Sequence, residues 1–345
     1  MTPTGTPGPA DATPGAPADA PAGDRHPADA SLARDAGPLR SVVIYNPVRV
    51  DGLAERRAAV EAALDGAGWP LPEWVETTAE DPGAGQARRA VEDGAQVVFA
   101  CGGDGTVRSC VEGLAGTGVA LAVLPAGTGN LLAANLGVPD DPAAAVQIVT
   151  EHGRRRIDVG EADGRVFAVM AGMGFDAALL DDASTELKAK AGPVAYVLSA
   201  LKHLRDRSMH LEIHLDDRPP VRRRARSVLI GNVGRLQGGV RLLADAAPDD
   251  GLMDVAVLAP RTIGHWIQTA WGVLRHPHRV AHLDVLRAAR IRVVSDREER
   301  RQVDGDVIDP GRTLTVTVRP QALELCVPRP ERSADLSEGS ERLGR

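Results

Sequence analysis

AQVVFACGGDGT, residues 95–106, is the stretch of sequence that decides the fold. The apolar run from Val97 to Cys101 is typical of a buried strand, and three glycines follow between positions 102 and 105. A helical pattern begins at Thr106, so the glycines form the turn between a strand and a helix. Backbone N–H groups in such a turn, together with the helix dipole, favour a bound phosphate.

Asp104 stands inside this turn, where its carboxylate would repel a phosphate. A divalent cation resolves the conflict because it bridges the two negative charges. The turn from Gly102 to Thr106 therefore predicts a phosphate cradle with a magnesium ion held by Asp104. The alternative is a tight turn in which Asp104 only caps the helix.

Strands and helices alternate on both sides of this stretch. Strand patterns are followed by helical spacing, with strands in SVVIYNP (41–47), PEWVETT (72–78) and ALAVLPAGTGN (120–130), and helices at 51–67, 85–93, 106–114, 130–136 and 142–151. Such alternation predicts a three-layer α/β domain, a parallel sheet with helices on both faces.

Ligands of parallel sheets bind at the carboxyl ends of the strands, and the unusual residues of this chain gather there. Asn46 and Pro47 end the first strand, and Thr77 and Thr78 end the second. The fourth strand ends in a second Gly-rich turn, which consists of Gly127, Thr128, Gly129 and Asn130. Because neighbouring parallel strands end at the same edge, we expect the two Gly-rich turns to lie side by side.

The pattern changes near Arg154. A hairpin with its turn at Asp163-Gly164 is followed by short strands, among them RIRVVS (290–295) and RRQVDGD (300–306), which predict a mainly antiparallel β-sandwich. Helical insertions are expected at 175–207 and 262–275. The prediction is an α/β domain at 40–153 and a β-rich domain at 154–328, with the site in the cleft between them.

The two ends of the chain have no apolar periodicity. A Pro/Ala-rich leader at 1–39 and a charged tail at 329–345 are predicted to be disordered, because they cannot bury enough surface to offset their ordering entropy.

Two acidic turns of the second domain are candidates for chemistry. Asp249 and Asp250 are adjacent and could hold a cation. Asp304 and Asp306 project to the same side if their segment is extended, and one of them could take a proton from an attacking hydroxyl. For each turn alone, a solvated loop is the alternative.

Composition excludes several classes of protein. The net charge is −7 and the pI is about 5.8, so there is no global electrostatic case for binding nucleic acid. Three cysteines without a CxxC spacing exclude a disulfide framework and fit a reducing compartment. No lysine stands in a Walker-type motif, and no apolar run reaches the roughly 18 residues of a membrane-spanning helix.

The chain resembles the diacylglycerol kinase catalytic-domain family, which includes bacterial lipid kinases and sphingosine kinases. The residues that carry the resemblance, in the family's order, are Asn46-Pro47, Gly102-Gly103-Asp104-Gly105-Thr106, Gly127-Thr128-Gly129-Asn130 with Leu136-Gly137, Gly172-Met173-Gly174-Phe175-Asp176, Gly231-Asn232, Asp249-Asp250-Gly251-Leu252-Met253-Asp254 and Val303-Asp304-Gly305-Asp306. The GGDGT motif is shared with NAD kinases and phosphofructokinases, whereas the motifs of the second domain single out the lipid kinases.

The resemblance implies ATP and Mg²⁺ as cofactors. The nucleotide would be bound by Asn46, Pro47 and Thr78, with Thr77 as the alternative, and by the two turns, Gly102, Gly103, Asp104, Gly105 and Thr106, and Gly127, Thr128, Gly129 and Asn130. Metal ligands would be Asp104 and, for a second Mg²⁺, the neighbouring Asp249 and Asp250 with the carbonyls of Ala247 and Leu252. Asp304 and Asp306 match the general-base motif.

The implied function is that of an ATP:lipid phosphotransferase of phospholipid biosynthesis. It would transfer the γ-phosphate of MgATP to a lipid hydroxyl, with diacylglycerol, which gives phosphatidic acid, as the first candidate. The alternatives are an NAD kinase-like or sugar kinase-like enzyme with a soluble acceptor, and a regulator that binds without transfer. We expect a cytoplasmic protein at the inner face of the membrane; a homodimer is an open option.

The sequence departs from the family's pattern in four places. Val48-Arg49-Val50 follow the Asn-Pro turn, and Leu131 stands where Asp is usual. Arg108-Ser109 replace Asn-Glu after GGDGT, and Asp306 replaces Glu. Because Asp306 is shorter by a methylene group, Asp304 is the preferred base.

Overall fold

The computed structural model describes residues 37–174, 208–235, 241–260 and 280–329, together with positions 262, 264, 265, 268, 269 and 272. The leader and tail expected at 1–39 and 329–345 lie almost entirely outside the described residues, as does the helical insertion expected at 175–207. Of the second helical stretch, expected at 262–275, six positions are described and five of them are helical.

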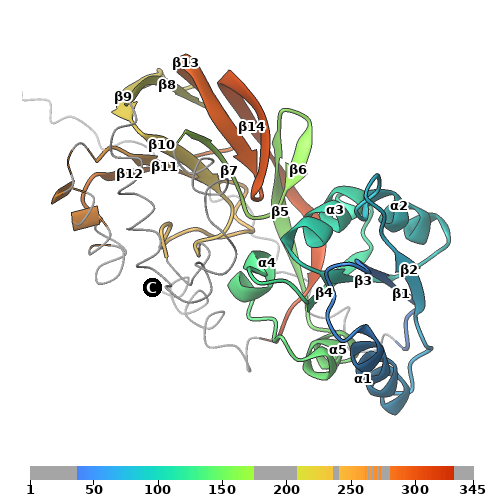
Figure 1. Cartoon of the computed structure of the whole chain (residues 1–345). Helices are drawn as coiled ribbons and strands as arrows, with labels where there is room; N and C mark the ends of the chain where they lie inside the picture. Colours follow the sequence, from blue (N-terminus) through green and yellow to red (C-terminus); the bar gives the residue numbers. More distant parts are fainter. Residues whose placement is uncertain are drawn as a thin grey trace, which may run out of the picture.

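The first domain is a parallel sheet between two layers of helices. Its strands lie in the order β2-β1-β3-β4, with β1 at Ser41–Tyr45, β2 at Glu73–Glu76, β3 at Val97–Gly102 and β4 at Ala120–Pro125. Figure 1 shows α1 (Leu53–Gly66) and α5 (Pro142–Thr150) on one face and α2 (Ala84–Glu92) and α3 (Asp104–Leu114) on the other. The short α4 (Leu131–Asn135) follows β4. The predicted α/β fold is confirmed.

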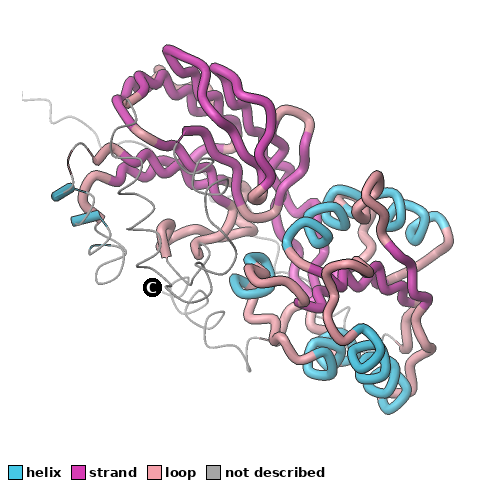
Figure 2. The backbone as a smooth tube through the Cα atoms, in the orientation of Figure 1, coloured by secondary structure: helices cyan, strands magenta, loops and turns pink. Residues whose placement is uncertain are grey.

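The second domain is built mainly from antiparallel strands, as predicted, and Figure 2 shows how strands dominate it. The strands are β5 (Arg154–Ala162), β6 (Arg165–Phe167), β7 (Met170–Gly174), β8 (Met209–Leu215), β9 (Val221–Ala225), β10 (Ser227–Gly231), β11 (Met253–Leu258), β12 (Leu283–Ala288), β13 (Arg290–Val303) and β14 (Asp306–Cys326). The two strands expected at 290–295 and 300–306 form one long strand, β13. Register shifts between Val294 and Arg301 let it stay paired with β14 across the intervening charged residues.

The last strand, β14, joins the two domains. It pairs antiparallel with β13 and β5, and its end pairs parallel with β4 through Glu324 and Leu325. Leu323 and Leu325 are fully buried in the core of the first domain. All fourteen described strands therefore form one continuous sheet, in which the red end of β14 reaches the green β4 in Figure 1.

Among the described residues, no helix has the length and apolar character needed to cross a bilayer.

A glycine permits the β5–β6 hairpin to close over an aromatic ring. Gly160 lies directly opposite Phe167, whose side chain is fully buried. A Cβ atom at Gly160 would lie 2.1 Å from Cζ of Phe167, so the ring occupies the space that any larger residue would need.

We expect Gly160→Ala to destabilise the protein by about 1–3 kcal/mol, because the methyl group displaces a buried ring in a close-packed core. Urea unfolding followed by circular dichroism measures the change. Gly66→Ala is the matched control: a Cβ atom at this position, the end of α1, would have no other atom within 4 Å, and alanine is the better helix former. A Gly160→Ala protein as stable as the control would contradict the close packing of Gly160 against Phe167.

Candidate active site

The two Gly-rich turns touch each other, which confirms that they lie side by side. A Cβ atom on Gly127 would lie 2.6 Å from Cα of Gly103, closer than two atoms can approach. The contact follows from the register of β3 and β4, in which Gly102 pairs with Pro125 at the last position of both strands. Two glycines at this point let two backbones meet, so their N–H groups share one surface.

Asp104 ties the two turns together. It is the first residue of α3, and its Oδ1 accepts a hydrogen bond of 2.6 Å from the backbone N–H of Leu131, the first residue of α4. Burial raises the pKa of Asp104, and hydrogen bonds from the backbone oppose the rise. The carboxylate therefore does not cap its own helix, whose N-cap is Gly103, but binds the start of α4 and so fixes one helix start against the other.

Side chains close each turn internally. Asn130 accepts a hydrogen bond from the N–H of Gly127 (3.0 Å) and donates one to its carbonyl (2.8 Å), with its backbone in the left-handed region at a φ of 44°. Thr106 is buried and folds over Gly102, where a Cβ atom would lie 2.6 Å from its Oγ1. Gly105 and Thr128 are exposed, and Gly129 is partly exposed, so the outer part of each turn faces solvent.

The other predicted nucleotide-binding residues end β1 and β2 at the same edge. The side-chain oxygen of Asn46 accepts hydrogen bonds from Val48 and Arg49, which shapes the loop that contains the exposed Pro47. Thr78 is exposed and accepts a hydrogen bond from the N–H of Asp81. The alternative, Thr77, is buried. Of the two threonines, Thr78 is thus the one that a bound molecule can reach.

Asp304 is not part of an extended segment, which corrects the expectation from the sequence. It opens the two-residue turn between β13 and β14 with a φ of 44°, and Gly305 follows at 86°, which is the backbone of an Asp-Gly hairpin. The turn separates the two acids: Asp304 faces the link between β6 and β7, and Asp306 faces α3.

Three consecutive backbone N–H groups hold the Asp304 carboxylate. Oδ2 accepts from Ala168 (3.0 Å), and Oδ1 accepts from Val169 (3.0 Å) and Met170 (2.7 Å). Burial raises the pKa of Asp304 to about 6, an increase that these donors and the Arg108 guanidinium limit. A carboxylate with a pKa near the operating pH is suited to accept a proton.

Asp306 is ion-paired with Arg108. The arginine lies on α3, and its Nη2 donates to Oδ2 of Asp306 across the boundary between the two domains. The Arg108 side chain is 11% exposed and that of Asp306 is 47% exposed. The helix that begins at the first Gly-rich turn is thereby linked to the hairpin that contains Asp304.

A single carboxylate at a phosphate-binding edge suits Mg²⁺, which takes its other ligands from phosphate oxygens and water. Asp104 fits this role. The second predicted cation site does not fit as the side chains stand, because Asp249 pairs with Arg155 at 2.9 Å and Asp250 pairs with Arg287. The described residues contain no group of three or more acidic, His or Cys side chains that could hold a metal, and the site at Asp249, Asp250 and Leu252 stays a prediction.

The turn that contains Asp249 and Asp250 is instead anchored through a buried carboxylate that was not predicted from the sequence. Asp158 is fully buried and accepts hydrogen bonds from the N–H groups of Gly251 (2.6 Å) and Gln321 (2.8 Å). Burial raises its pKa, and the charges of Asp250 and Asp249 raise it further. No sequence motif marks Asp158, because its partners are backbone groups far away in the chain.

Asn232 connects this anchor to Asp304. Its Nδ2 donates to the carbonyls of Asp158 (2.8 Å) and Ala168 (3.0 Å), and Ala168 in turn donates to Asp304. The Gly-Asn pair was part of the resemblance but had no assigned role. Its amide holds the strand link that supplies the three N–H donors.

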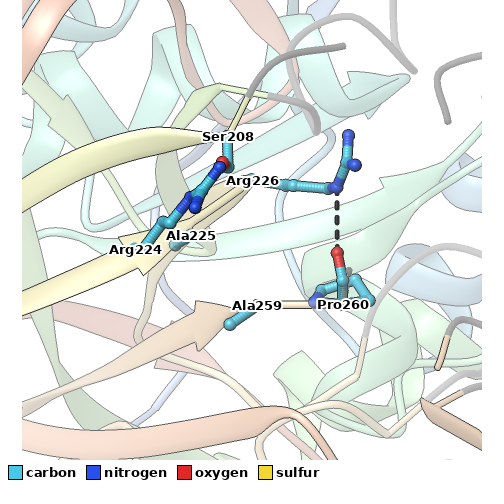
Figure 3. A pocket seen from close by; sticks show the side chains of 6 residues that line it. All are labelled: Ser208, Arg224, Ala225, Arg226, Ala259 and Pro260. Atoms are coloured by element: carbon cyan, nitrogen blue, oxygen red, sulfur yellow. Dashed lines mark hydrogen bonds between the residues drawn. The ribbon is translucent and has the colours of Figure 1, made fainter. Parts of the chain in front are cut away.

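A shallow pocket lies at the other end of the second domain's strands. It has a volume of about 120 Å³ and is lined by Ser208, Arg224, Ala225, Arg226, Ala259 and Pro260 (Figure 3). Arg224 donates to the Ser208 hydroxyl (2.6 Å) and Arg226 to the Pro260 carbonyl (2.9 Å). Because β10 runs from this pocket to Gly231, next to Asn232, the pocket is separate from the phosphate turns.

Comparisons with known proteins agree with this architecture. The diacylglycerol kinase catalytic domain model matches residues 40–162, and the model of the YegS C-terminal NAD kinase beta sandwich-like domain matches residues 168–327. A diacylglycerol kinase structure from Bacillus anthracis has the same fold, with a TM-score of 0.65 at 20% identity; the match covers 84% of this chain and 97% of that chain.

Two curated relatives match most of the chain. A Pseudomonas aeruginosa protein named "Probable lipid kinase YegS-like" is 36% identical over 292 residues, 80% of this chain and 91% of that protein. A Bacillus subtilis protein named "Diacylglycerol kinase" is 29% identical over 277 residues, 77% of this chain and 89% of that protein. With both domain models matched in order, the chain belongs to the diacylglycerol kinase catalytic-domain family, as a kinase with a YegS-type C-terminal β-sandwich domain.

Proposed function

We propose that this kinase transfers the γ-phosphate of ATP to a hydroxyl group of a membrane lipid, with diacylglycerol as the first candidate and phosphatidic acid as its product. The observation that carries the proposal is the link between α3 and the β13–β14 hairpin. It joins a phosphate-binding turn to a carboxylate that is held in place and has a raised pKa.

The nucleotide phosphates lie against the two Gly-rich turns in this scheme. Phosphoryl transfer depends mainly on positioning and on electrostatic stabilisation, and backbone N–H groups at a helix start supply both. Asp104 would hold Mg²⁺, which would supply positive charge for the transferred group. Asn46 and Thr78 border the rest of the nucleotide.

Asp304 acts as the general base. A carboxylate has about four lone-pair positions, and three of them accept backbone N–H groups here. The fourth belongs to Oδ2 and accepts the proton of the lipid hydroxyl as its oxygen attacks the γ-phosphorus. The three donors keep this oxygen in one orientation, which reduces the entropy cost of reaching the reactive geometry.

The acceptor class is proposed from the relatives. Proteins named as a lipid kinase and a diacylglycerol kinase match this chain over both domains. A lipid acceptor requires the enzyme to work at the bilayer surface, and the expected location at the inner face of the membrane follows from that requirement. The identity of the lipid stays a prediction, and a homodimer stays an open option.

We expect Asp304→Asn to lower kcat by about 10²- to 10⁴-fold, because an amide cannot take the proton of the attacking hydroxyl. The assay combines γ-labelled ATP and Mg²⁺ with diacylglycerol, sphingosine or undecaprenol in mixed micelles, and counts label in the organic extract. Asp309→Asn is the matched control, since this acid is exposed and lies on the same hairpin.

Organic-extractable label from the wild type and the control, but not from Asp304→Asn, is the expected result. Label that stays in the aqueous phase with every lipid would point to a soluble acceptor. Full activity in a folded Asp304→Asn protein would remove Asp304 from the mechanism.

The pH profile gives a second test. The base works as the carboxylate, so kcat/KM should fall as the pH drops through about 6. With an aspartate of ordinary pKa, the fall would come only near pH 4. Binding of MgATP measured over the same pH range separates Asp304 from Asp104, whose pKa is also raised. A profile that is flat from pH 7 to pH 5 would contradict the assignment of Asp304.

A further inference from the structure

Two residues that depart from the family's pattern contact each other in the structure. Arg108 stands where the pattern has Asn, Asp306 stands where it has Glu, and the two side chains form the ion pair between the domains. We propose that Arg108 is a catalytic residue whose guanidinium binds the γ-phosphoryl group of ATP during transfer, and that Asp306 holds the guanidinium in place beforehand. The inference deepens the proposed kinase function and rests on it.

The helix geometry directs Arg108 toward the phosphate turn. Arg108 lies four residues after Asp104 on α3, so the two residues share one face of the helix. Side chains on a helix lean toward its N-terminus, and the N-terminus of α3 is the phosphate turn itself. The guanidinium therefore lies on the side of the helix on which the proposed phosphates and Asp104 lie.

The hydrogen bonding of Arg108 is incomplete. Nη2 donates to Asp306, whereas Nε is buried and no described residue accepts a hydrogen bond from it. A buried donor without an acceptor costs free energy comparable to a lost hydrogen bond. A phosphate oxygen would satisfy Nε, because guanidinium groups bind phosphate through paired N–H donors.

The charge around the site also requires a cation. Asp104, Asp304 and Asp306 place three carboxylates next to the position of a highly charged anion. Arg108 is close enough to Asp304 to influence that carboxylate, so its positive charge lies between the phosphate turn and the base. In the transfer step, the lipid oxygen bonds to the γ-phosphorus while the bond to the β,γ-bridging oxygen breaks. The hydroxyl proton passes to Asp304, and Arg108 keeps its protons throughout.

Nucleotide binding tests the proposal without a lipid. ADP lacks the γ-phosphate, so removal of Arg108 should weaken binding of the ATP analogue AMP-PNP and leave ADP binding unchanged. With Mg²⁺ present, calorimetry on Arg108→Gln should give a Kd for AMP-PNP about tenfold higher than in the wild type, and a Kd for ADP within about twofold. Arg108→Lys retains the charge but not the paired N–H donors of the guanidinium, so its Kd for AMP-PNP should lie between those of the wild type and Arg108→Gln.

Kinase assays add a second readout. An arginine that acts on the transferred group contributes up to about 10³- to 10⁵-fold in kcat, so Arg108→Gln should lose at least about 100-fold. Arg57→Gln is the control, since Arg57 is a half-exposed arginine of an ion pair on α1. It should match the wild type in binding and turnover, and thermal unfolding checks that each variant is folded.

A charge swap separates catalysis from simple cross-linking of the domains. Arg108→Asp with Asp306→Arg keeps an ion pair but moves the positive charge to the other domain. The swapped protein should stay defective in AMP-PNP binding and turnover. Restored function in the swap, or equal losses of ADP and AMP-PNP binding in Arg108→Gln, would overturn the proposal. If the wild type phosphorylates no lipid but Arg108→Gln still loses AMP-PNP binding alone, the lipid kinase proposal fails and the assignment of Arg108 stands.

Discussion

The contact between the backbones of Gly103 and Gly127 is the constraint on which the candidate active site depends. A Cβ atom on Gly127 would collide with Cα of Gly103, so the two turns meet backbone to backbone at the level at which β3 and β4 both end. Asp104 then reaches from one helix start to the other. The close approach of these two turns therefore determines where the N–H groups, the carboxylate and the helix dipoles meet.

Backbone donors, more than charged partners, orient Asp304 and Asp158 in the second domain. Asp304 is held by three N–H groups at the link between β6 and β7, and Asp158 by two N–H groups from distant parts of the chain. Asn232 donates to the carbonyl of Asp158 itself and to that of Ala168, one of the three donors to Asp304. The backbone donors lower the pKa of Asp304, as does Arg108, but burial outweighs both, so the carboxylate is held in place and still has a raised pKa.

Local patterns in the sequence predicted the fold well. Apolar runs, glycine turns and helical spacing indicated the strands and helices of the first domain, and the Asp-Gly turn at Asp163 predicted the β5–β6 hairpin. The site was predicted less completely. The Gly-rich turns and Asp104 could be recognised from the local sequence, because a backbone turn that suits a phosphate needs glycines at the end of a strand.

Long-range partnerships carried no such signal. Asp158 receives its hydrogen bonds from residues more than ninety positions away, and Asp304 depends on N–H groups that any residue could supply. The ion pair of Arg108 and Asp306 joins two departures that are far apart in the sequence and were considered one by one. The extended shape assumed around Asp304 was wrong because an Asp-Gly pair favours the turn that β13 and β14 require.

The pairing of β14 with β4 affects how the protein folds during synthesis. Its end pairs with β4 although the two segments are about 200 residues apart, and Leu323 and Leu325 complete a core that otherwise belongs mainly to the first half of the chain. During synthesis, the open edge of β4 must wait until the second domain has left the ribosome. Such late closure raises contact order and slows folding, and until it occurs the unpaired edge of β4 can pair with another chain. The catalytic domain is therefore not a module that can be separated from its β-sandwich.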